Sequence, residues 1–199
     1  MFRIGLDITH IDYSTAMENI IRTARENPEL MGGMKLPPFF NAGMLKMIPD
    51  AQKNAYLVQG ISQGKDRIIP MLTAQISPLA GAVQIHDISA SAPGRDGAAL
   101  EISIEIADLD RARVIELICT KLLQQEDIPA ILQEHYENSI TMENLAFYMN
   151  GQQPATQEYL IVKSLSVRKQ TLKGLIEAQA GQKGFPMQIA GLHFFYKAD

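Results

Sequence analysis

The 199 residues suffice for one large domain or two small ones, and 46% of them are hydrophobic, enough to fill a core. The formal net charge is -4 and no block of Lys and Arg stands out, so we expect no nucleic-acid partner. A single cysteine excludes an intrachain disulfide, and no apolar run has the length of a membrane span or the setting of a secretory signal. These features predict a cytoplasmic protein without a membrane partner.

The first predicted element is a strand over residues 2–8. Its sequence, "FRIGLDI", alternates apolar and other residues, which is the period of a half-buried strand. Asp12 follows at the position of a helix N-cap, and apolar residues then recur at helical spacing over 16–24.

A segment rich in methionine and phenylalanine follows over 29–47. Gly32-Gly33 and Pro37-Pro38 interrupt regular structure, so we expect an apolar, adaptable loop. The loop either folds back over the core or forms a lid or a surface for a partner. The candidate interaction residues in it are Met31, Met34, Phe39, Phe40 and Met44.

The middle of each half leaves two alternatives open. Residues 55–60 follow a proline and carry helical spacing, whereas residues 158–163 are rich in strand formers. Requiring the two segments to agree favours helix in both. A further helix follows in each half, with Pro70 as a kink or a boundary in the first, and each half closes on a strand, "AVQIHDISA" or "PMQIAGLHFFY".

The second half of the chain resembles the first. Residues 3–21 overlay on 101–119, 56–58 on 159–161 and 83–88 on 187–192, in the same order and at a nearly constant offset. In the first block Ile4, Ile8, Asp12, Glu18 and Ile20 meet Ile102, Ile106, Asp110, Glu116 and Ile118. We therefore predict a tandem duplication with copies at 1–92 and 98–199 and a linker at 93–97.

Each predicted copy is a strand, several helices and a strand, so the fold class is α+β. Two strands alone are marginally stable in water, whereas two copies supply four. We expect the copies to pair pseudo-symmetrically around one shared small sheet with helices on a face, as in a symmetric dimer fused into one chain.

Polar residues at the strand ends of the first copy form a candidate site. His10, Asp12, His86 and Asp87 could bind a metal ion or act as an acid and base pair, if the two strands are neighbours. The matching positions of the second copy hold Asp108, Asp110, Ala190 and Gly191, so the constellation is not repeated. The alternative is that these are ordinary capping and surface residues. We expect no cofactor.

The C-terminal strand carries a second candidate surface. Phe194 and Phe195 are adjacent and so point to opposite faces, and Tyr196 follows them. Both faces then need cover, from this chain or from another subunit. His193, in the same strand, is interpreted as strand packing.

The sequence contains no phosphate-binding loop and no nucleophile elbow, so the case for an enzyme is weak. We expect a non-enzymatic protein-interaction or self-associating module, with a protein partner or a homodimer. One alternative is a small-molecule-binding module with its pocket between the two copies. The other is a metal-dependent enzyme that uses the His/Asp cluster of the first copy.

Overall fold

The computed structural model describes residues 1–26, 43, 47–81, 83–92, 99–133 and 139–196. In chain order the elements are β1 (Phe2–Ile11), α1 (Tyr13–Glu26), α3 (Asp50–Ala80), β2 (Val83–Ser91), β3 (Leu100–Leu109), α4 (Arg111–Leu117), a π-helical turn (Ile118–Leu122), a 3-10 turn (Gln125–Asp127), α5 (Ile128–Leu132), α6 (Met142–Asn150), α7 (Pro154–Val167), α8 (Lys169–Gln182) and β4 (Met187–Tyr196). The fold is α+β, as expected. The five candidate residues of the Met-rich segment and the predicted linker lie outside the described residues.

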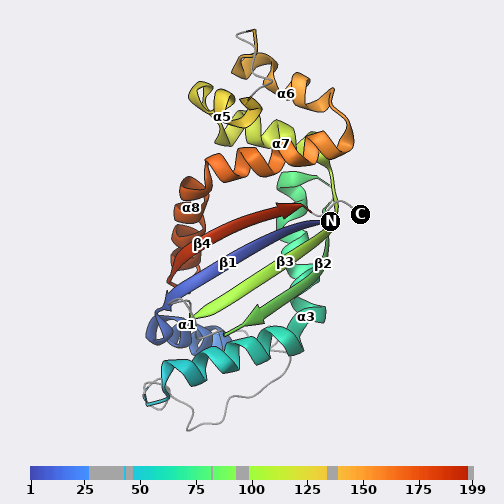
Figure 1. The fold of residues 1–199 in the computed structure, drawn as a ribbon. Helices are drawn as coiled ribbons and strands as arrows, with labels where there is room; N and C mark the ends of the chain where they lie inside the picture. Colours follow the sequence, from blue (N-terminus) through green and yellow to red (C-terminus); the bar gives the residue numbers. More distant parts are fainter. Residues whose placement is uncertain (27–42, 44–46, 82, 93–98, 134–138, 197–199) are drawn as a thin grey trace.

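The four strands form one antiparallel sheet in the order β2-β3-β1-β4 (Figure 1). Helices separate β1 from β2 and β3 from β4 in the chain. Each of these two crossovers joins strands that run in the same direction, and a strand from the other half of the chain lies between them. This is the split β-α-β arrangement. The sheet therefore interleaves the two halves of the chain.

The pairing register is the same at equivalent places in the two halves. Gly5 pairs with Ser103, which is its equivalent in the sequence overlay. Ile85 pairs with Ile106, and their equivalents Ile189 and Ile8 pair with each other. In both outer pairs the register shifts on each side of these isoleucine pairs, as at a β-bulge.

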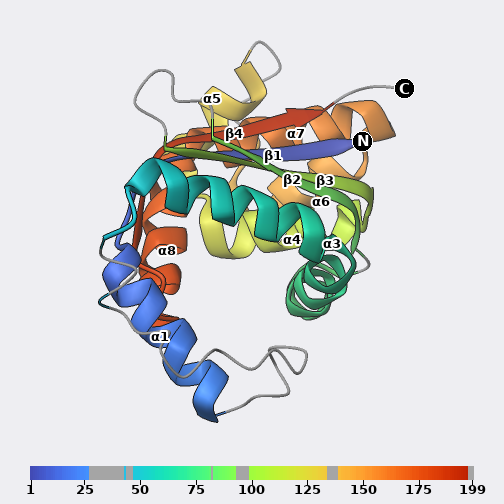
Figure 2. The ribbon, with the colours of Figure 1, turned by 90° about the horizontal axis from the view of Figure 1, so that it is seen from below.

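The helices α1, α3, α4 and α8 lie on one side of the sheet, as Figure 2 shows. The alternating apolar residues of the strands point to this side and form two buried clusters. One contains Phe2, Val83, Ile85 and Ile106, with partly buried residues of α3 packed against it. The other contains Ile8, Ile11, Tyr13 and Leu100.

Residues 55–60 and 158–163 are both helical, within α3 and α7. The strand alternative for the second segment is therefore wrong. Leu160, Ile161 and Ser164 are buried at helical spacing, so tertiary packing outweighs the strand propensity of the run. Pro70 lies inside α3, which continues to Ala80, so no helix boundary falls at this proline.

The second half also contains a helical lobe that lies beyond β4 in Figure 1. Its core is formed by residues of α4, the π-helical turn, α5, α6 and α7. The buried Asp127 accepts a hydrogen bond of 2.6 Å from Arg168 Nε, at the break between α7 and α8. Cys119 is buried in this core, as expected of a small apolar residue, and burial raises the pKa of its thiol to about 11.

The buried phenol of Tyr13 makes the stability of the fold sensitive to alkali. Its hydroxyl donates a hydrogen bond to Asn54 Oδ1, and burial, with the charge of Asp50, raises the pKa of Tyr13 from 10.0 to about 12. The unfolded chain loses this proton first, so stability is expected to fall as the pH rises from 10.0 towards about 12. Urea unfolding across this range should show a smaller loss for Tyr13→Phe than for the wild type. Tyr56→Phe, at an exposed position, should lose as much stability across this pH range as the wild type does.

Candidate functional site

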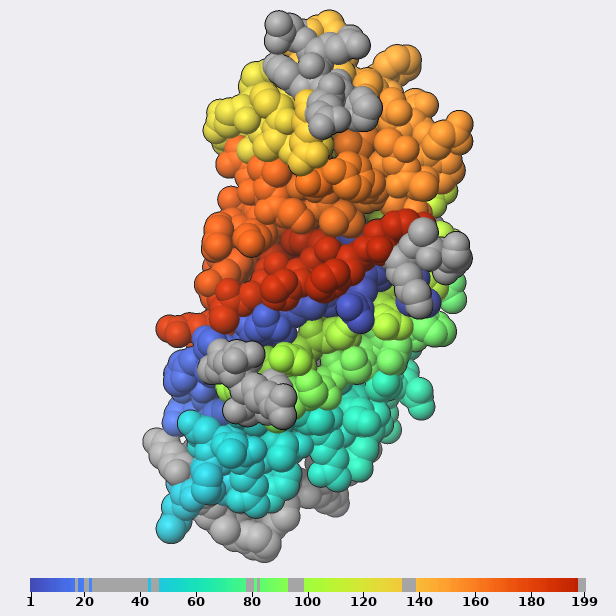
Figure 3. All heavy atoms as spheres, viewed as in Figure 1, coloured from blue at the N-terminus to red at the C-terminus, as the bar shows by residue number. Residues whose placement is uncertain are grey.

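The face of the sheet opposite the helices is not covered by the described residues. Arg3, Gly5 and Asp7 alternate with the core residues of β1 and so lie on this face, as do Glu101 and Ser103 of β3. In Figure 3 the strands form a band of exposed surface between the orange helices of the second half and the teal residues of α3. The sheet thus presents a polar surface to solvent.

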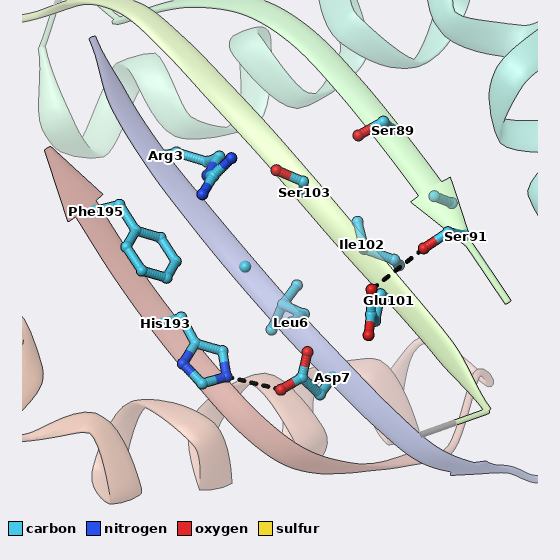
Figure 4. A pocket seen from close by; sticks show the side chains of 12 residues that line it. Arg3, Leu6, Asp7, Ser89, Ser91, Glu101, Ile102, Ser103, His193 and Phe195 are labelled. Carbon is cyan, nitrogen blue, oxygen red and sulfur yellow. Dashed lines mark hydrogen bonds and ion pairs between the residues drawn. The ribbon is translucent and has the colours of Figure 1, made fainter. Parts of the chain in front are cut away.

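A depression of about 480 Å³ lies on this face, and all four strands contribute to it (Figure 4). Gly5 contributes to the lining, between its cross-strand neighbours Ser103 and His193, which line the depression as well. The lining residues are Arg3, Gly5, Leu6, Asp7, Ser89, Ala90, Ser91, Glu101, Ile102, Ser103, His193 and Phe195. Its volume is in the range of sites for small organic ligands.

One wall of the depression is a hydrogen-bonded pair of side chains, Asp7 and His193, which lie near opposite ends of the chain. His193 Nε2 lies 2.7 Å from Asp7 Oδ2, and the two side chains are 49% and 33% exposed. The His193 ring stacks on Phe195, with 6.0 Å between the ring centroids. The guanidinium of Arg3 lies 4.8 Å from the centroid of the Phe195 ring, in the range of a cation-π contact.

The opposite wall carries a second carboxylate. Glu101 is directly across from Asp7 in the β1–β3 register, and it accepts a hydrogen bond of 3.3 Å from Ser91 Oγ. Like charges directly opposite on neighbouring strands destabilise a sheet. Asp7 has His193 beside it, but within the described chain no Lys, Arg or His lies within ion-pair distance of Glu101. This end of the depression is therefore acidic.

The structure explains why residue 191 is glycine, whereas Asp87, which overlays on it in the sequence, is aspartate. A Cβ atom on Gly191 would overlap Asp7 Oδ2 and would lie 2.5 Å from His193 Nε2. The Asp7–His193 pair thus occupies the space that a side chain at 191 would need. Asp87, which overlays on residue 191 in the sequence, instead forms an ion pair of 2.7 Å with Lys65.

We expect Gly191→Ala to separate Asp7 from His193 without unfolding the protein. Both obstructing atoms are the ends of side chains that can turn into solvent, and an exposed contact of this kind contributes only about 0–1 kcal/mol whether or not His193 is charged. A crystal structure of the variant should show the pair broken, with the midpoint of urea unfolding little changed. Gly5→Ala is the matched control, because its nearest neighbour is at 3.6 Å and the pair should persist. An intact pair in Gly191→Ala would contradict this explanation.

The structure does not bring His10 and His86 together. Asp87, next to His86, pairs with Glu105, and Glu105 pairs with Arg3 near the start of β1. His10 is seven residues further along β1, which corresponds to about 23 Å of extended strand. Among the described residues, moreover, no group of three or more His, Cys, Asp or Glu side chains could hold a metal ion.

The two aspartates of that predicted cluster have separate local partners. Asp12 accepts hydrogen bonds from the backbone N–H of Thr15, at 3.1 Å, and from the Thr15 hydroxyl, at 2.8 Å, so it caps α1. These bonds lower the pKa of Asp12. The hydrogen bond from Lys65 likewise lowers the pKa of Asp87. The capping interpretation thus accounts for Asp12, and Asp110 caps α4 in the same way.

The C-terminal aromatic residues occupy different environments. Phe194 packs against Phe2, with 6.3 Å between the ring centroids, and belongs to the core side of the sheet. Phe195 is 46% exposed on the open face. The two rings do point to opposite faces, and Tyr196 ends the strand half-buried. His193, interpreted as strand packing, does stack on Phe195, but it does so on the open face, where it also contacts Asp7.

Sequence reasoning missed the open face as a site. Alternation alone places Arg3, Asp7 and Glu101 opposite the core residues, but it does not say which strands are neighbours. Asp7 and His193 are 186 residues apart in the chain. The one sequence signal was Gly191 at a position that overlays on Asp87 in the first half of the chain.

Comparison of the chain with protein-family models, with curated proteins and with solved structures finds no match. None of the described helices combines the length and the apolar character that crossing a membrane requires.

Proposed function

We propose that the protein is a non-enzymatic binding module that holds a small molecule in the depression of the open sheet face. The observation that carries this proposal is the depression itself, which is lined by all four strands and contains charged, aromatic and hydroxyl side chains. The lining residues sit on paired strands, whose register fixes their spacing. A rigid platform of this kind suits recognition of a ligand.

The arrangement of the site favours binding over catalysis. His193 is held by Asp7, but the strand that carries Gly5 separates it from Ser103, the hydroxyl in the same row of the sheet. A histidine base requires its nucleophile within hydrogen-bond reach. In Figure 4 the Ser103 and His193 side chains do not point towards one another.

A small-molecule screen tests this proposal. Wild-type protein is screened by thermal shift, and each hit is mapped by amide proton–nitrogen correlation spectra. We expect hits that perturb the amides of Gly5 and Ser103 and that are lost in Gly5→Leu, whose side chain would fill the depression. Gly174→Leu is the control. It lies in α8, where nothing surrounds an added side chain, and it should still bind the hits. Hits that persist in Gly5→Leu, or no hits at all, would contradict the proposal.

A protein-interaction or self-associating module is the second candidate. It is supported by Phe195, a large apolar side chain that is half-exposed on β4, and by the position of β4 at the edge of the sheet. Sedimentation equilibrium distinguishes the candidates. A dimer that dissociates in Phe195→Ser, but not in Phe147→Ser on the helical lobe, would favour self-association. A monomer in both would count against a homodimer through this strand.

We also infer that the chain is a tandem duplication whose copies share the sheet. The support is that the sequence overlay and the strand register agree. Arg3 pairs with Glu105, and their equivalents Glu101 and Asp7 pair with one another, as a two-fold axis near Gly5 requires. On this proposal the depression lies near the axis, between the two copies.

A further inference from the structure

We propose that the depression recognises a small dipolar molecule, whose anionic group is bound by Arg3 and whose ammonium or guanidinium group is bound by Glu101 with Asp7. This inference rests on the proposed function, because it names the class of ligand for the same site.

The two ends of the depression carry opposite charge. Arg3 and Asp7 lie on the same face of β1, four residues apart, with Gly5 between them. Four residues of extended strand correspond to about 13 Å between their Cα atoms, and the long side chain of Arg3 shortens the gap between the charges. Glu101 adds a carboxylate beside Asp7. Gly5 leaves the middle of this path open.

The charged groups at the two ends are not ion-paired with one another. In the described part of the chain no carboxylate lies within ion-pair distance of Arg3, whose recorded contact is with the face of Phe195. Glu105 is across from Arg3 in the register, but it does not line the depression. The recorded partner of Glu101 is the neutral hydroxyl of Ser91. Both groups therefore keep hydrogen-bonding capacity for a ligand.

The middle of the depression suits an apolar stem. The ring of Phe195 and the side chain of Ile102 contribute to the lining, and Gly5, which has no side chain, lies between its cross-strand neighbours Ser103 and His193. A chain of methylene groups laid over Gly5 would join the two charged ends. A ligand with one charge only would satisfy one end and leave the other unpaired.

Three related probes test this inference on the full chain. 6-Aminohexanoate carries both charges on a methylene chain, whereas hexylamine and hexanoate each carry one. Amide spectra are recorded during titration with each probe. We expect 6-aminohexanoate to shift the Gly5 and Ser103 amides and to bind about tenfold or more tightly than either singly charged probe, since each charged hydrogen bond adds affinity.

Two variants test which side chain binds which charged group of the probe. Glu101→Gln should lower the affinity for 6-aminohexanoate and for hexylamine and leave the affinity for hexanoate unchanged. Arg3→Met should lower the affinity for 6-aminohexanoate and for hexanoate and leave the affinity for hexylamine unchanged. Glu143→Gln is the matched control, because it makes the same change of charge at an exposed position of α6, outside the depression, and it should change none of the three affinities.

If hexylamine or hexanoate binds at these amides as tightly as 6-aminohexanoate, recognition of a dipole is wrong and the proposed binding module stands. If no probe shifts these amides while hits of the screen do, the proposed class of ligand is again wrong, whereas the proposed binding site stands. If neither probes nor hits shift them, both proposals fail.

Discussion

The fragment 1–92, expressed alone, is expected to form no folded monomer. Within it β1 and β2 do not touch, because β3 lies between them in the sheet and belongs to the second half. The fragment would expose both edges of β1 and would lose the contact of Leu100 with the Ile8 cluster. Two unpaired strands with a few helices lack a core of sufficient size.

Circular dichroism, amide spectra and sedimentation of the fragment check this expectation. Mixing it with 98–199 should restore the sheet as a one-to-one complex. Assembly of 1–92 into a symmetric dimer would also fit, because a second copy of β1 could occupy the place of β3. A folded monomer with a cooperative melting transition would contradict the shared sheet.

Leu145→Ala is expected to lower the free energy of unfolding by about 2–5 kcal/mol, the range for a fully buried leucine that leaves a cavity. Leu145 is 0% exposed in the core of the helical lobe. Phe147, two residues further along α6, is 85% exposed. Phe147→Ala removes more atoms from the same helix, yet it should change stability by no more than about 0.5 kcal/mol.

Urea unfolding of the two variants, with the wild type alongside, gives the comparison. Equal losses would mean that α6 is packed through Phe147 as well and that the described core is incomplete. A loss of stability confined to Leu145→Ala would confirm that α6 packs in the lobe through its buried face. Unchanged stability in both variants would contradict the packing described for α6.

The strands were predictable because their signal is local. The alternation in 2–8 marks β1, and the N-cap position of Asp12 marks the start of α1. The segment 158–163 shows where local signals fail, since Leu160 and Ile161 favour a strand but become buried on one helical face. Comparison of the two halves resolved this case correctly.

The site was harder to predict because it depends on which strands are neighbours. His10 and His86 lie in similar contexts in the sequence, yet β3 separates their strands and the two residues lie at opposite ends of the sheet. Asp7 and His193 give no local signal at all, because their contact exists only through the β1–β4 register. Only Gly191, whose missing side chain leaves room for this contact, gives a signal of it in the sequence.

A crystal structure of the protein with 6-aminohexanoate, or with the strongest hit of the screen, tests the central claim most directly. Our account predicts ligand density over Gly5, with an anionic group at Arg3 and a cationic group at Glu101. Ligand density at another place, with the Gly5 depression left to solvent, would contradict it.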